Sequence, residues 1–197
     1  MRKGVTIAYY DGNAERFALE TRSVDFGAVQ KEFTDRLREG AFILDFGCGS
    51  GRDAKTFLDQ GYVVEAVDGS SELCKLASEY TGIEVKQMLF QQLEETEKYD
   101  GIWACSSILH LPVDDLADVM RKMTAALKAG GIIYTSFKYG TFAGVRNGRY
   151  FTDMTEDTID VFLEKVEKIM IEKQWLSTDV RPGRGEERWL NLILRKR

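Results

Sequence analysis

Short apolar runs alternate with amphipathic stretches from Ala41 onward, and this alternation predicts a parallel β-sheet covered by helices. The runs are rich in β-branched and aromatic residues and have Gly or Asp at their edges, which is typical of buried strands. We predict five such strands, at residues 41–46, 62–67, 83–87, 99–105 and 131–137.

Apolar residues at helical spacing mark two further segments. The first begins just after Pro112 and places these apolar residues on one face: Leu116, Val119, Met120, Met123 and Leu127. The second covers residues 159–170, with Thr155 as its N-cap. We expect both apolar faces to pack into the core.

The two ends of the chain follow different patterns. Residues 174–180 and 188–195 predict a closing antiparallel hairpin, joined by the turn Pro182-Gly183-Arg184-Gly185. Residues 14–19 and 26–37 predict helices that precede the sheet and cover the site. The glycine-spaced stretch 138–150 is the longest predicted loop, and we interpret it as a lid.

Composition favours one folded domain. The 197 residues are 44% apolar and 30% charged, and no internal repeat or low-complexity tract divides them. We therefore predict a single domain over residues 1–197, with 1–40 as the helical cover and 41–197 as the sheet unit. The net charge of −5 provides no general attraction for phosphate backbones, so a nucleic-acid partner is not expected.

Cysteine usage and the N-terminal sequence indicate the compartment. Cys48, Cys74 and Cys105 form no CxxC pair, so neither a disulfide framework nor a metal site is predicted. Residues 1–13 contain no apolar signal segment, and no apolar run approaches the ~18 residues that a membrane span needs. We therefore expect a cytoplasmic protein that does not associate with membranes.

The first predicted strand runs into Gly47, Gly49 and Gly51, three glycines at alternate positions. Glycines there allow a tight turn and a close approach of the backbone to a ligand at the carboxyl end of the strand. A dinucleotide fold would instead have the spacing G-x-G-x-x-G, whereas Arg52 stands at the position of its third glycine. The spacing therefore argues against NAD.

Two acidic residues point to the same conclusion. Asp45 lies two residues before Gly47, where a carboxylate would repel a pyrophosphate and attract an ammonium or sulfonium cation. Asp68 ends the second strand, 17 residues after Gly51, where a carboxylate accepts the hydrogen bonds of a ribose diol. A nucleoside with a cationic tail matches both acids.

With these motifs, residues 41–137 resemble the class I S-adenosylmethionine-dependent methyltransferases. That resemblance implies an α/β fold, a Rossmann-like, doubly wound, seven-stranded and mostly parallel sheet with strand order 3-2-1-4-5-7-6 and an antiparallel last strand. Within the family, Tyr9-Tyr10-Asp11 and Gly148-Arg149-Tyr150-Phe151 resemble small bacterial enzymes of the tellurite-resistance type.

The resemblance also implies S-adenosyl-L-methionine as the cofactor. In the family the glycine loop surrounds the methionine moiety, the acid after strand two holds the ribose, and residues after strand three flank adenine. Many members have an Asp after strand three, and Gln87 to Phe90 contain none, so backbone groups or Gln91 would take its place. The implied cofactor contacts are Tyr10, Asp45, Gly47, Cys48, Gly49, Gly51, Asp68, Gly69, Ser70, Met88, Leu89, Phe90 and Cys105.

His110 and Arg149 are the candidate catalytic residues. His110 is the only histidine and follows the fourth strand, where it would orient an acceptor or take its proton, unless it is merely a structural residue at the start of a helix. Arg149, with Lys138 and Arg146 in the same loop, would hold an anionic acceptor, unless the loop is simply solvated.

The predicted function is methyl transfer to an N, O, S or similar nucleophile of a small molecule. Because the sulfonium is already electrophilic, alignment and exclusion of water suffice, and no general base is obligatory. The alternatives are a catalytically silent S-adenosylmethionine-binding module with a regulatory or interaction role, and a nicotinamide oxidoreductase. The sequence leaves the acceptor and the oligomeric state open.

Overall fold

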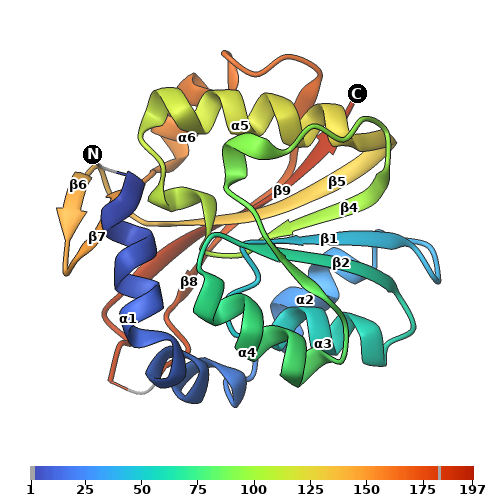
Figure 1. The fold of residues 1–197 in the computed structure, drawn as a ribbon. Helices are drawn as coiled ribbons and strands as arrows, with labels where there is room; N and C mark the ends of the chain where they lie inside the picture. Colours follow the sequence, from blue (N-terminus) through green and yellow to red (C-terminus); the bar gives the residue numbers. More distant parts are fainter. Residues whose placement is uncertain (1–2, 182) are drawn as a thin grey trace.

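The computed structural model describes residues 3–181 and 183–197 and contains a seven-stranded sheet in the order β3-β2-β1-β4-β5-β9-β8 (Figure 1). Strands β1 to β5 are parallel, and β9 runs antiparallel to both β5 and β8. The predicted order 3-2-1-4-5-7-6 with an antiparallel last strand is therefore confirmed. The strands are β1 (Phe42–Phe46), β2 (Val63–Asp68), β3 (Val85–Gln87), β4 (Tyr99–Ala104), β5 (Leu127–Lys138), β8 (Ile169–Thr178) and β9 (Arg188–Lys196).

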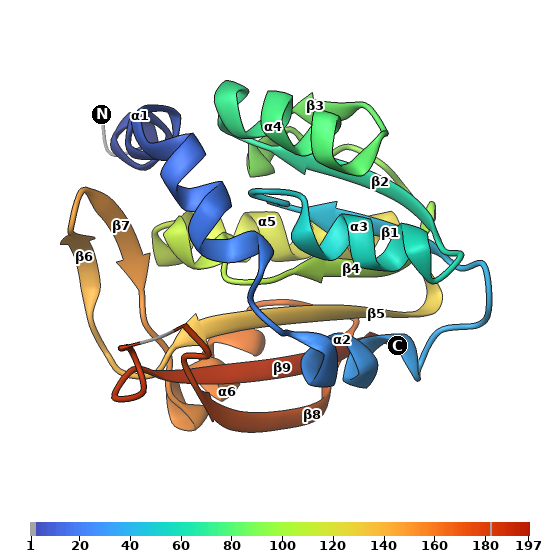
Figure 2. The same cartoon turned by 90° about the horizontal axis from the view of Figure 1, so that it is seen from below.

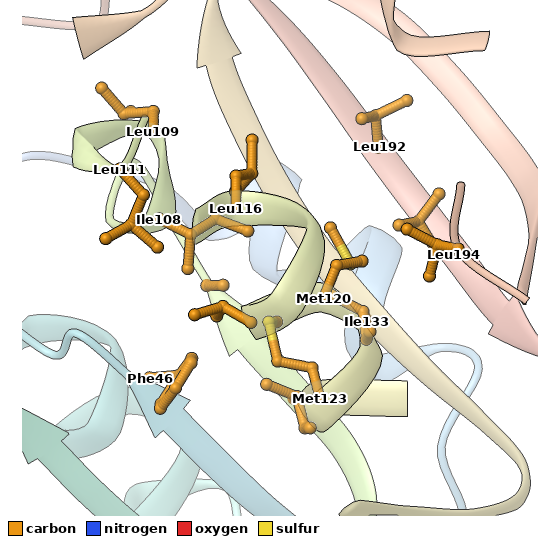
Figure 3. Close-up of a cluster of buried hydrophobic side chains, with 14 of the residues drawn as sticks. Phe46, Ile108, Leu109, Leu111, Leu116, Met120, Met123, Ile133, Leu192 and Leu194 are labelled. Atoms are coloured by element: carbon orange, nitrogen blue, oxygen red, sulfur yellow. The ribbon is translucent and has the colours of Figure 1, made fainter. Parts of the chain in front are cut away.

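Helices cover both faces of this sheet because its strands are apolar on both sides. In β4, Ile102 packs toward α5 (Val113–Ala126) and α6 (Glu156–Leu163), whereas its neighbour Trp103 packs toward α2 (Gly27–Thr34) and α3 (Arg52–Asp59). The helix α4 (Ser71–Thr81) lies beside α3 over β2 and β3. In Figure 3, Met120 and Met123 of α5 lie against the sheet that carries Ile133, as the helical spacing predicts.

The structure differs from two of the predicted elements, and the first is the helix expected after Thr155. The helix expected over residues 159–170 ends at Leu163, and Ile169 begins β8, where it pairs with Lys196 of β9. Lys168, with φ +61°, turns the chain between the two elements. The N-cap is as predicted, because the Thr155 side chain accepts a hydrogen bond from the Thr158 N–H.

The expected loop 138–150 contains most of a second, two-stranded sheet. Here β6 (Ala143–Arg146) and β7 (Arg149–Thr152) form an antiparallel hairpin around Asn147 and Gly148, both with positive φ. Asn-Gly is the preferred sequence for such a two-residue turn, so a local signal for the hairpin was present in the chain. Pro182, part of the other predicted turn, lies outside the described residues.

The two N-terminal helices have different surroundings. The helix α1 (Lys3–Arg22) is longer than predicted, is interrupted at Asn13, and lies beside β7 and α4 (Figure 2). By contrast, α2 buries Phe33 against Trp103 in the core, with ring centroids 5.2 Å apart. Of the two, α1 therefore covers the carboxyl ends of the strands, and α2 belongs to the layer on the sheet. Short 3-10 turns η1 (Phe90–Gln92) and η2 (Ile108–His110) follow β3 and β4.

Candidate functional site

The glycine loop after β1 brings backbone close to the neighbouring loop. Gly47 has φ +86°, and a Cβ there would lie 2.5 Å from the Cβ of Ser107. The Gly47 and Cys48 N–H groups both donate to the Val67 carbonyl, each over 2.9 Å. A larger residue at position 47 would therefore force the loops apart.

Asp68, at the end of β2, is held by backbone donors. Its Oδ2 accepts from the Gly49 N–H and its Oδ1 from the Ser70 N–H, both over 2.9 Å. Burial raises the pKa of Asp68, and these hydrogen bonds act in the opposite direction. Each carboxylate oxygen has a further lone pair, so Asp68 can still accept hydrogen bonds from a ligand.

Thirteen of the fifteen predicted site residues line one cavity of about 540 Å³. They come from α1, the carboxyl ends of β1, β2, β3 and β4, and the β6–β7 hairpin. These residues are Tyr10, Gly47, Cys48, Gly49, Asp68, Gly69, Ser70, Met88, Leu89, Phe90, Cys105, His110 and Arg149.

Asp45 and Gly51 are the two predicted residues that do not line this cavity. Asp45 is only 2% exposed and is directed toward α3, where it accepts a hydrogen bond from the Ala54 N–H. This orientation follows from strand alternation, because its neighbours Leu44 and Phe46 face α5. Gly51 has φ +80°, and a Cβ there would lie 3.1 Å from that of Ala77, so it allows close packing on α4. Direct contact of Asp45 and Gly51 with a ligand stays a prediction, and neither residue lines the cavity.

One end of the cavity is mostly apolar, with a single amide. Met88, Leu89 and Phe90 form its wall, and Gln91 also lines it. The Gln91 Nε2 is buried without a hydrogen-bond partner among the described residues. A flat heterocycle with a hydrogen-bond acceptor would satisfy that amide.

His110, at the other end, has both ring nitrogens engaged. Its Nδ1 lies 2.6 Å from the Tyr150 carbonyl oxygen, which can only accept, so Nδ1 carries the proton. The unprotonated Nε2 then accepts from the Tyr10 hydroxyl over 3.0 Å. Burial lowers the pKa of His110 to about 4, so the ring is neutral near pH 7.

Arg149 has no acidic partner among residues 3–181 and 183–197, unlike the other two cations of the predicted cluster. Lys138 pairs with Glu187 and Arg146 with Asp153. The Arg149 guanidinium instead stacks on rings, 4.6 Å from the centroid of Tyr9 and 5.2 Å from that of Phe151. Its Nη1 lies 3.4 Å from the Tyr10 hydroxyl, and its buried Nε has no partner among the described atoms.

Sequence reasoning missed the charged pair at the start of α3. Arg52 and Asp53 line the cavity and form an ion pair with Nε 2.8 Å from Oδ1. Asp53 also accepts from the buried Trp103 Nε1 over 2.8 Å and from the Gln30 amide over 2.7 Å. The only local signal was an adjacent pair of charges directly after the glycines, and their burial depends on Trp103 and Gln30.

Burial favours the protonated form of the cysteine thiols at the site. Burial raises the pKa of Cys105 to about 12 and that of Cys48 well above its usual range. Within residues 3–181 and 183–197, no cluster of three or more His, Cys, Asp or Glu side chains could hold a metal ion. Nor is any helix of that part of the chain long and apolar enough to cross a membrane.

Comparison with known proteins gives a consistent picture. Residues 43–131 match a family model described as a methyltransferase domain. Over 125 residues the chain is 32% identical to the N-terminal Xaa-Pro-Lys N-methyltransferase 1 of Bos taurus, which covers 56% of each protein. The chain thus spans about half the length of that curated relative.

Two solved structures share the fold over nearly the whole chain. A 1,6-didemethyltoxoflavin-N1-methyltransferase of Burkholderia thailandensis, crystallised with 1,6-didemethyltoxoflavin and S-adenosylhomocysteine, superimposes with a TM-score of 0.79 at 21% identity. It covers 98% of this chain and 88% of its own. A TehB-like S-adenosylmethionine-dependent methyltransferase of Corynebacterium glutamicum has a TM-score of 0.73 at 22% identity and covers 96% and 99%.

Proposed function

We propose that the chain is a class I S-adenosylmethionine-dependent methyltransferase that methylates a nucleophilic N, O, S or similar atom of a small molecule, in keeping with the match of residues 43–131 to a methyltransferase domain. The observation that carries the proposal is the single cavity that joins Asp68 and the glycine loop to His110 and Arg149. One end suits a nucleoside, and the other offers polar groups to a second molecule.

The residues present fit S-adenosylmethionine. Asp68 would hold the ribose hydroxyls with its remaining lone pairs, and Met88 to Phe90 would flank adenine. The unpartnered Gln91 amide would donate to a ring nitrogen, which replaces the Asp found in many family members. When bound, the cofactor supplies an electrophilic methyl group on a sulfonium.

The chain's own residues then orient the acceptor and exclude water. Arg149 is the cation placed to hold an anionic group of the acceptor, because no acid of the described chain neutralises it. His110 is a poor proton acceptor, since its pKa is lowered to about 4 and its Nε2 is already occupied by Tyr10. We therefore assign His110 the orienting role rather than that of a general base.

The first test is ligand binding. Calorimetry with S-adenosylhomocysteine should show binding in the micromolar range or tighter, corresponding to about 8 kcal/mol, whereas NAD should give no signal. Asp68→Ala should weaken this binding by about 1 to 3 kcal/mol, because hydrogen bonds to a charged acceptor contribute that much. Asp59→Ala is the control, since the Asp59 side chain is 61% exposed and pairs only with Lys55.

Contrary results would be equally clear. Binding of NAD without S-adenosylhomocysteine would support an oxidoreductase, and unchanged affinity in folded Asp68→Ala would place the ribose elsewhere. A catalytically silent binding module is the remaining alternative. It would bind S-adenosylhomocysteine yet release none from S-adenosylmethionine with any small N–H, O–H or thiol acceptor.

The proposal also covers the acceptor class, the compartment, the partners and the domain organisation of the chain. A small-molecule acceptor, a cytoplasmic location and the lack of a nucleic-acid partner remain predictions from composition and charge, as does the single-domain organisation.

A further inference from the structure

The acceptor end of the cavity contains a directed chain of hydrogen bonds. Arg149 Nη1 donates to the Tyr10 oxygen over 3.4 Å, Tyr10 donates to His110 Nε2 over 3.0 Å, and His110 Nδ1 donates to the Tyr150 carbonyl over 2.6 Å. The direction is fixed at both ends, because a guanidinium can only donate and a carbonyl can only accept.

This direction determines what Tyr10 can offer to a ligand. Tyr10 lines the cavity, and because its only hydroxyl proton is used on His110, its oxygen can act toward a ligand only as a hydrogen-bond acceptor. A ligand group that meets Tyr10 must therefore bring its own N–H or O–H. His110 acts here as a positioning residue for Tyr10.

Arg149 sets a second requirement for the ligand, which is a negatively charged group. It lines the same cavity, its Nε is buried without a partner, and no acid of the described chain pairs with it. Stacking on Tyr9 and Phe151 holds the guanidinium plane and leaves for a ligand the edge that carries Nη2, which is neither buried nor hydrogen-bonded among the described residues. A carboxylate matches that edge in charge and shape.

Aromatic rings lie against the Arg149 guanidinium and continue along the cavity wall. Tyr10, Phe151 and Trp189 line this end of the cavity, and Lys138 lies within 6.0 Å of the Phe151 ring and 5.1 Å of the Trp189 ring. Such walls favour a flat, apolar ligand body over a flexible polar one.

We infer that Arg149 and Tyr10 form an acceptor subsite for a small aromatic acid, in which Arg149 binds the carboxylate and the Tyr10 oxygen accepts a hydrogen bond from the ring N–H or O–H that is methylated. The inference rests on the proposed function and names its substrate class. It also assigns the Tyr10 hydroxyl to the acceptor rather than to the cofactor.

Calorimetry on the protein saturated with S-adenosylhomocysteine tests the subsite without turnover. The probes are the three isomers of hydroxybenzoate, the matching hydroxybenzamides, and benzoate. At least one hydroxybenzoate should bind about tenfold or more tightly than its amide, because charge-assisted hydrogen bonds are about twice as strong as neutral ones. The same hydroxybenzoate should bind more tightly than benzoate, which has no donor for Tyr10.

Two variants separate the two contacts. Arg149→Gln should abolish the preference for acid over amide, and Tyr10→Phe should abolish only the preference for hydroxybenzoate over benzoate. Arg38→Gln is the matched control, because the Arg38 side chain is 68% exposed, pairs with Asp100 and does not line the cavity. Unchanged affinity of each variant for S-adenosylhomocysteine would show that the cofactor end is intact.

Three results would overturn the inference: no binding of any acid to the saturated wild type, equal binding of acids and amides, or wild-type acid binding by Arg149→Gln. The saturation step itself reports on the proposed function. If S-adenosylhomocysteine does not bind, that function fails first, whereas failure of the acids alone leaves it standing and rejects only the aromatic-acid class.

Discussion

At the scale of single residues, burial holds several ionisable groups of the site toward their neutral forms. It raises the pKa values of Asp45 and Asp68 and lowers that of His110, because each charged form loses its hydration in the interior. The Asp45 Oδ2 is buried without a partner among the described residues. Of these three groups, His110 is the one next to Arg149, whose charge also lowers the His110 pKa.

His110 gives a direct test of this burial. It is the only histidine, so its ring C–H resonances can be assigned without ambiguity, and their titration should show a pKa near 4 rather than near 6.5. An NMR titration from pH 3.5 to about 8 covers both values. A midpoint near 6.5 would mean that the ring is hydrated and that the hydrogen bonds to Tyr10 and Tyr150 are not maintained.

The same shift predicts a pH dependence of stability. The folded state keeps His110 neutral below the ordinary pKa, while the unfolded chain binds a proton there. The corresponding stability is therefore present above about pH 6.5 and is lost as the pH falls toward 4, by up to about 3 kcal/mol. His110→Gln, which keeps one donor and one acceptor, should lose less stability over this range in urea unfolding. If the free energy of unfolding depends on pH in the same way in the wild type and in His110→Gln, His110 is not the source of the pH dependence.

At the scale of elements, α1 is attached to the rest of the molecule in two separate halves. Before Asn13, the Thr6 Oγ1 accepts from the Tyr150 N–H over 3.0 Å, and Tyr10 bonds His110. After Asn13, the Thr21 and Ser50 hydroxyls lie 2.8 Å apart, which ties this half to the glycine loop. The first half is therefore held by the β6–β7 hairpin and also by the cofactor end, where the Ser70 hydroxyl donates to Asp11 Oδ1 over 2.6 Å, whereas the second half is held at the glycine loop.

Thr6→Val should loosen the first half alone. The isosteric change leaves the buried Tyr150 N–H without its acceptor, a local cost of about 1 to 3 kcal/mol. Hydrogen exchange should accelerate in residues 3–12 and at Tyr150, with little change in α3 or α4. Thr21→Val is the control and should leave exchange in residues 3–12 as in the wild type. Uniform acceleration across the chain would instead show that α1 opens only with global unfolding.

At the scale of the whole molecule, the cavity lies where the strand order reverses direction. Strand β1 has β2 on one side and β4 on the other, so the loops after these strands diverge to opposite faces and leave a crevice at their carboxyl ends. The antiparallel β9 then brings Trp189 and Asn191 to the acceptor side. Segments from α1 to β9 thus meet in one space.

A ligand in that space should stabilise the entire fold. With S-adenosylhomocysteine at 100 times its Kd, the free energy of unfolding should rise by about 2.7 kcal/mol, and NAD should produce no rise. Thermal unfolding followed by tryptophan fluorescence would report the change, because Trp103 is buried and bonds Asp53 of the cavity wall. A rise in the fluorescence midpoint that other probes of unfolding do not share would indicate that the ligand orders only part of the molecule.

Much of the architecture could be predicted from local sequence. The five parallel strands, the helix at α5, the Thr155 cap and the glycine loop depend on residues close together in the chain, whose spacing and backbone preferences are visible directly. The position of Asp68 at a strand end and its bond from the nearby Ser70 N–H belong here too, whereas its second backbone donor, Gly49, comes from the glycine loop. The strand order came from the family resemblance rather than from these patterns.

Other features depended on contacts between distant segments. Ile169 has the spacing of a helix, yet pairing with β9 makes it a strand residue, because hydrogen bonds across the sheet outweigh a weak local preference. Asp45 lies in β1, directly before the glycine loop, and its carboxylate faces α3 rather than the cavity, which only the arrangement of α3 and the cavity around β1 shows. The contacts of Tyr10 with His110 and Arg149 join residues 100 and 139 positions apart. The sequence by itself determined which residues stand at the ends of strands, since that is local; only the tertiary structure decided which of their side chains meet, because that depends on how separate elements pack.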